Sequence, residues 1–71
     1  MIKISQIKKD IKLSLDYGVD NPNNKTLHIR SIIDDDYVVF KWWSRTKQRW
    51  IYQVEHKMYF EVNNDVMFIK N

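Results

Sequence analysis

The pattern that most constrains the fold begins at Thr26. From there, apolar and polar residues alternate in short runs that are rich in β-branched and aromatic side chains, which is typical of half-buried β-strands. Clusters of Asp and Asn interrupt the pattern at 34–36 and 63–65, where turns are expected. The sequence therefore predicts a series of antiparallel strands, at residues 26–33, 37–43, 49–55, 57–62 and 66–70.

The segment before this pattern is spaced differently. Apolar residues recur at intervals of three and four, which favours a helix over about 4–16. These residues are Ile4, Ile7, Ile11 and Leu15. Residues 11–15 also alternate as a strand does, so this second interpretation stays open. Gly18 is suited to end a helix, and the Asn and Asp residues of 17–25 predict a loop.

The fold class expected from these two regions is α+β. An N-terminal helix would pack on a curved antiparallel sheet of four to five strands, and a small SH3-like or OB-like barrel is one form of this arrangement. With 71 residues, residues 1–71 form a single domain. The chain has no cysteine, so disulfides and thiolate metal sites are excluded, and the ten aromatic residues must supply much of a small core.

A register for the hairpin at 37–55 follows from its apolar residues. If 44–48 form the loop, Trp43 lies opposite Arg49, and six large apolar side chains share one face. The resulting pairs are Trp42 with Trp50, Phe40 with Tyr52 and Val38 with Val54. A second hairpin with 63–65 as its loop pairs Val62 with Val66 and Phe60 with Phe68. Between the hairpins, one long strand would bend near His56.

Residues 41–50 contain three tryptophans and four cations and are predicted to form a binding surface. In the register above, Trp43 lies on the face opposite the core row, so it is free to stack on nucleic-acid bases or to fill a pocket of a protein partner. The predicted binding residues are Lys41, Trp43, Arg45, Lys47, Arg49 and Ile51. In the competing interpretation, Trp43 packs beneath the N-terminal helix.

The three consecutive acids Asp34, Asp35 and Asp36 form a secondary acidic patch. They are interpreted as an acidic turn, with a basic surface of a partner or a divalent cation as the alternative ligands. They lack the spacing and the glycine of an EF-hand loop. His28 and His56 are the only histidines, and no metal site is predicted from them.

No catalytic motif is present: a nucleophile elbow, a P-loop and a dinucleotide fingerprint are all absent. We therefore predict no enzyme and no cofactor. The chain shows no signal peptide and no apolar run long enough for a membrane span, so a cytoplasmic protein without a membrane partner is expected.

The chain is short, lacks alanine and is rich in aromatic residues. In length and composition it resembles the small accessory proteins of phages and mobile elements, which include inhibitor-type and anti-CRISPR-like proteins. The resemblance implies a small non-catalytic inhibitor or adaptor that docks on a host or defence protein, such as a nucleic-acid-handling complex, through the basic-aromatic hairpin. The alternative is a module that binds DNA or RNA directly with the same hairpin. Either a monomer or a homodimer is expected.

Overall fold

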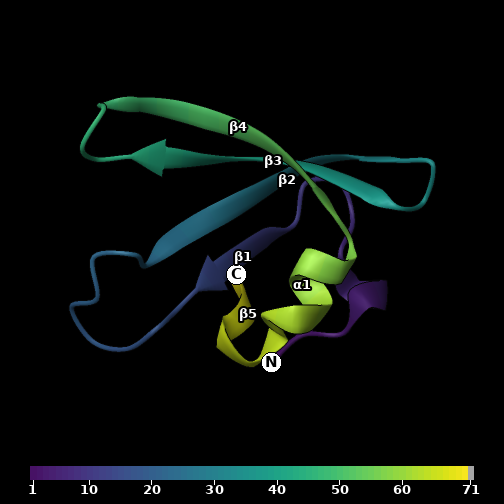
Figure 1. The fold of residues 1–71 in the computed structure, drawn as a ribbon, viewed down its shortest axis with the longest axis horizontal. Helices are drawn as coiled ribbons and strands as arrows, with labels where there is room; N and C mark the ends of the chain where they lie inside the picture. Colours follow the sequence, from purple (N-terminus) through teal and green to yellow (C-terminus); the bar gives the residue numbers. More distant parts are fainter. Residues whose placement is uncertain (71) are drawn as a thin grey trace.

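A computed structural model describes residues 1–70 and shows one antiparallel sheet of five strands in the order β4-β3-β2-β1-β5 (Figure 1). The strands are β1 (Lys12–Leu15), β2 (Lys25–Ile33), β3 (Tyr37–Ser44), β4 (Arg49–His56) and β5 (Met67–Lys70). Three short helical segments complete the fold: η1 (Ile4–Gln6), α1 (Met58–Val62) and η2 (Asn64–Val66). Four of the five strands lie close to the ranges that the alternating pattern predicted.

The predicted α+β class is wrong, because the structure is mostly antiparallel sheet and the expected N-terminal helix over 4–16 does not form. Only the 3-10 turn η1 forms there, and residues 12–15 are strand β1, which lies between β2 and β5. Leu13 and Leu15 are buried, at 0% and 3% exposure, and backbone pairing on both sides of β1 stabilises the extended form over a helix. The strand interpretation of 11–15 was therefore the correct one.

The predicted strand at 57–62 is also wrong. Residues 58–62 form α1, whose first residue donates its backbone N–H to His56 Nδ1 at 3.1 Å. At its end, Asn63 Nδ2 donates to the carbonyl of Tyr59 at 2.7 Å. The expected pairs of Val62 with Val66 and of Phe60 with Phe68 do not form, because residues 58–62 are helical, Val66 belongs to η2, and Phe68 of β5 lies opposite Ser14 of β1. The short helix brings Phe60 into the core, at 0% exposure.

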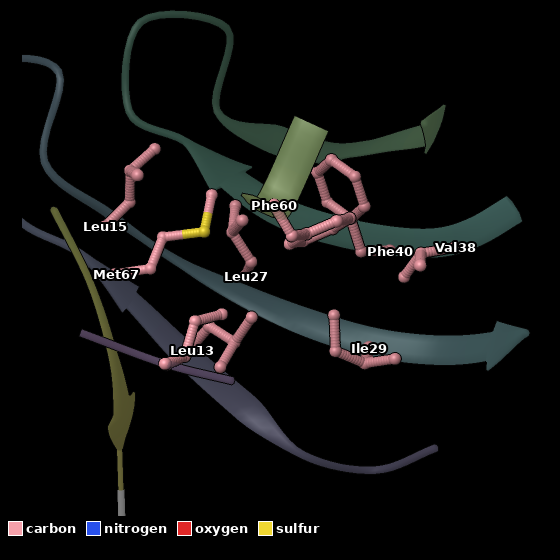
Figure 2. Close-up of a cluster of buried hydrophobic side chains, with 9 residues drawn as sticks. Leu13, Leu15, Leu27, Ile29, Val38, Phe40, Phe60 and Met67 are labelled. Carbon is pink, nitrogen blue, oxygen red and sulfur yellow. The ribbon is translucent and has the colours of Figure 1, made fainter. Parts of the chain in front are cut away.

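The core lies on one face of the sheet, which we call the inner face. Nine apolar side chains are buried there: Ile2, Leu13, Leu15, Leu27, Ile29, Val38, Phe40, Phe60 and Met67. Figure 2 shows side chains of β1, β2, β3 and β5 pointing toward Phe60 of α1. Within residues 1–70, β4 and β5 have one strand neighbour each, so the sheet is open and the expected barrel is wrong as well.

The register of the β3–β4 hairpin differs by one residue from the prediction. Trp43 lies opposite Trp50, and Ser44 lies opposite Arg49, so the turn has four residues, 45–48. Ser44 Oγ accepts the Lys47 backbone N–H at 3.1 Å, and Gln48 takes a left-handed φ of 54°. A shift of one residue moves every side chain of a strand to the other face.

The face assignment of β4 changes accordingly. Trp50, Tyr52 and Val54, which were expected in the core, are 39%, 62% and 55% exposed. Ile51 and Gln53 take their place on the inner face, where Gln53 accepts a hydrogen bond from the Trp42 indole. A four-residue turn held by Ser44 thus removes three large side chains from the core.

Candidate functional site

The face of the sheet opposite the core carries an unusual set of side chains, and we call it the outer face. The inner-face elements α1 and η1 lie together on the other side of the sheet (Figure 1). From β5 to β4, strand register assigns to the outer face Phe68, Lys70, Lys12, Ser14, Thr26, His28, Ser31, Ile33, Tyr37, Val39, Lys41, Trp43, Trp50, Tyr52, Val54 and His56. None of these described residues is Asp or Glu.

One cross-strand row of the outer face is cationic. Lys70 lies opposite Lys12, Lys12 opposite His28, His28 opposite Lys41 and Lys41 opposite Tyr52. Neighbouring strands are about 4.8 Å apart, so the five residues span roughly 19 Å across the sheet. We call Lys70, Lys12, His28 and Lys41 the cationic row.

An aromatic cluster lies beside this row. The rings of Trp43 and Trp50 meet edge to face with centroids 5.5 Å apart, and His28 meets Trp50 in the same way at 5.2 Å. Lys41 Nζ lies 4.3 Å from the centre of a Trp50 ring, in a cation–π contact. Trp43 is 42% exposed. Trp43 thus has one ordered ring contact and Trp50 has three, while part of the surface of each indole remains exposed.

The cationic row changes the titration of the histidine within it. Burial, followed by the positive charges of Lys12, Lys41, Lys70 and Arg30, lowers the pKa of His28 below its ordinary value. His28 is therefore neutral at pH 7, and the lysines supply the charge of the row. Arg30 adds a further cation at the bulge in β2, where the pairing shifts between Ile29 and Ser31.

The acidic patch 34–36 lies at the other end of the hairpin. Asp34 and Asp35 have φ of 52° and 60°, which is the left-handed pair of a tight hairpin turn that Asp tolerates. Asp36 forms an ion pair with Lys57, 3.2 Å away. Trp43 is six residues along β3 from Tyr37, so roughly 20 Å separates the turn from the tryptophan pair. The patch is accounted for by turn geometry, and it lies far from the aromatic cluster.

The predicted binding residues occupy three places. Lys41 and Trp43 lie together on the outer face, whereas Ile51 is half-buried on the inner face. Arg45 and Lys47 are exposed in the β3–β4 turn, and Arg49 is exposed at the start of β4. The prediction missed Trp50, Tyr52, His28, Lys12 and Lys70. The alternation in β4 contained the signal for Trp50 and Tyr52, but the cationic row arises from pairing between distant strands.

A groove of about 790 Å³ continues the surface at the turn end of the hairpin. It runs between the loop at 20–24 and the β3–β4 turn, and Lys25, Trp42, Trp43 and Arg45 are among the residues that line it. Lys25 Nζ lies 3.8 Å from the centre of a Trp42 ring, and burial lowers its pKa. Trp43 therefore borders both the outer face and the groove.

Comparison with protein families, with curated proteins and with solved structures gives no match to this chain. Among residues 1–70, no helix is long and apolar enough to cross a membrane. The same residues contain no cluster of three or more His, Cys, Asp or Glu side chains that is suited to a metal ion.

Proposed function

We propose that this chain is a non-catalytic binding protein for single-stranded nucleic acid, and that the outer face is its binding surface. The observation that carries the proposal is an acid-free sheet face on which a row of lysines borders two partly exposed tryptophans. Proteins that bind single strands combine a positive surface that follows the phosphates with aromatic rings on which bases stack. An open antiparallel sheet is suited to presenting such rings.

The form of the surface favours a single strand over a duplex. Trp43 and Trp50 can stack only on bases that are unpaired and turned outward, because the bases of a duplex are stacked on each other. The described chain also has no long helix that could enter a major groove. The acidic patch 34–36, which would repel a phosphate backbone, lies roughly 20 Å from the tryptophans along β3.

The charges give an expected salt dependence. If the three lysines of the cationic row each contact one phosphate, the logarithm of affinity for a single strand falls with the logarithm of salt at a slope of about −2, from about −0.7 per contact. Participation of Arg45 and Lys47 in the turn would increase this slope to about −3.5. The measured slope therefore gives the number of cations that contact phosphates.

A second candidate function is docking on a protein as an inhibitor or adaptor, as small phage accessory proteins do. The specific observation that favours it is the exposure of Tyr52 and Val54, at 62% and 55%. These side chains lie beyond the cationic row and carry no charge. A protein that covers this face would need an acidic rim and an apolar centre.

The test is fluorescence anisotropy with short labelled DNA and RNA single strands, a duplex of the same sequence, and polyglutamate as a competitor without bases. Trp43→Ala should lower affinity for the single strand by about 5- to 140-fold, as expected from stacking worth about 1–3 kcal/mol per base. Lys41→Gln should reduce the salt slope by about 0.7. Tyr17→Ala and Lys3→Gln, which are exposed residues away from the outer face, are the matched controls and should change neither value.

Three results would overturn the proposal. The first is no binding to any single strand at low salt. The second is duplex binding that is as tight as single-strand binding. The third is competition by polyglutamate as effective as that by the oligonucleotide, which would indicate an acidic protein partner and favour the second candidate.

A further inference from the structure

The two edges of the sheet differ in how they are protected against pairing with another chain. The β5 edge is only four residues long and ends at Lys70. The β4 edge has eight residues, Arg49–His56, with no lysine and no proline. Exposed edge strands usually carry such residues, or are short, because a free row of backbone N–H and C=O groups otherwise pairs with a neighbour. In Figure 1, β4 forms the boundary of the molecule.

The charges of β4 are complementary to those of a second copy of the same strand. Arg49 and Glu55 lie at opposite ends and on the inner-face side of the strand. In an antiparallel pair centred on Tyr52, Arg49 of each copy lies opposite Glu55 of the other. Among residues 1–70, the one ion pair joins Lys57 and Asp36, so neither Arg49 nor Glu55 has an ion-pair partner within the described chain.

Other antiparallel registers that place the outer faces of both copies on the same side of the sheet lose the pairing of Arg49 with Glu55. Moving the centre by one residue toward Ile51 places Arg49 opposite the neutral Gln53. Moving it by one residue toward Gln53 places Arg49 opposite Lys57, where two positive charges meet. Oppositely charged pairs directly across strands are stabilising and like charges are destabilising, so the charge pattern selects the register centred on Tyr52.

We propose that two copies of this chain associate through antiparallel pairing of their β4 strands. The dimer would have one continuous sheet of ten strands, with both outer faces on the same side. At the seam, Tyr52 lies opposite Tyr52, and Trp50 lies opposite Val54. This arrangement accounts for apolar side chains that are otherwise 62% and 55% exposed at Tyr52 and Val54. The association does not depend on the proposed function, and its test uses no nucleic acid.

The test is sedimentation equilibrium of the full chain over a range of concentrations, with charge exchange at the seam. The wild-type protein should reach twice the chain mass of 8.8 kDa. Arg49→Glu and Glu55→Arg should each raise the dissociation constant by about 10-fold or more, because each change places like charges at two symmetric positions. The double variant restores opposite charges and should restore the dimer. Arg45→Glu, in the turn outside β4, is the control and should leave the dimer intact.

A wild-type protein that stays monomeric up to about 1 mM overturns the proposal. Failure of the double variant to recover, when circular dichroism shows that it is folded, also overturns it. A second measurement uses the wild-type protein and so does not depend on whether a variant folds. Protection of alternate β4 amides from hydrogen exchange should rise with protein concentration. Protection that is independent of concentration contradicts pairing at this edge.

Discussion

Replacing Trp50 by alanine tests the register of the β3–β4 hairpin, on which the outer face depends. Trp50 is 39% exposed and makes three aromatic or cation–π contacts, with Trp43, His28 and Lys41. Aromatic contacts of this kind contribute about 0.5–1.5 kcal/mol each, and less where they are exposed. We therefore expect Trp50→Ala to lower the free energy of unfolding by about 1–2 kcal/mol.

The matched comparison is Phe40→Ala on the inner face of β3. Phe40 is 1% exposed and meets Phe60 edge to face, with ring centroids 5.7 Å apart. Removing a fully buried phenylalanine costs about 3–5 kcal/mol. A domain of this length has a total stability of roughly 4–10 kcal/mol, so this variant should be marginally folded or unfolded.

Urea unfolding followed by far-ultraviolet circular dichroism separates the two outcomes. With a slope of about 1 kcal/mol per molar urea for a small domain, Trp50→Ala should lower the midpoint by about 1–2 M. Phe40→Ala should lower it by about 3 M or more. If Trp50→Ala proved as destabilising as Phe40→Ala, Trp50 would belong to the core. The register with Trp42 opposite Trp50 would then be correct, and Trp50, Tyr52 and Val54 would belong to the inner face.

Two further outcomes follow from the core and from the cationic row. Phe60→Ala should cost about 3–5 kcal/mol in urea unfolding because Phe60 is fully buried, whereas Val62→Ala in the same helix, at a position 73% exposed, should change stability by less than about 0.5 kcal/mol. The lowered pKa of His28 means that the unfolded chain takes up a proton more readily than the folded one as pH falls below the ordinary value of 6.5. The free energy of unfolding should therefore decrease as the pH falls from 7 to below 6.5. His28→Gln should remove the part of this decrease that is due to His28, when urea midpoints are compared across pH. A pH profile that is the same in the variant would contradict the lowered pKa of His28.

The sequence predicted most of the sheet because alternation is a local signal. The ranges of β2, β3, β4 and β5 lie within one or two residues of those expected from period and turn residues. The N-terminal segment was mispredicted because both a helix and a strand fit its apolar residues. Pairing of Leu13 with Leu27 and Ile69 decided between them, and contacts between such distant residues are not visible in a local window.

The candidate site was predicted in part for a related reason. Lys41 and Trp43 were placed on the face away from the core because alternation within β3 alone determines their side. The face of Trp50 depends on the length of the turn, which could not be read from alternation. Hydrogen bonds from the Lys47 N–H to Ser44 Oγ and from Gln48 Nε2 to the Arg45 carbonyl stabilise this turn at four residues. The positions of Lys12 and Lys70 depend on the strand order, which places the first strand, β1, beside the last, β5.

The pairing of β1 with β5 limits the order in which the sheet can form. The β2–β3 and β3–β4 pairings are hairpins that close over short turns, but Lys12 and Lys70 are partners 58 residues apart in the sequence. Long-range contacts form slowly because closing a long loop costs more conformational entropy. Met67, at 0% exposure, enters the core from β5, so the hydrophobic core stays incomplete during synthesis until residues 67–70 have left the ribosome. Without β5, the edge of β1 beside Leu13 and Leu15 would be unpaired, so a chain that lacks residues 67–70 is expected to be more exposed to aggregation and proteolysis than the folded domain.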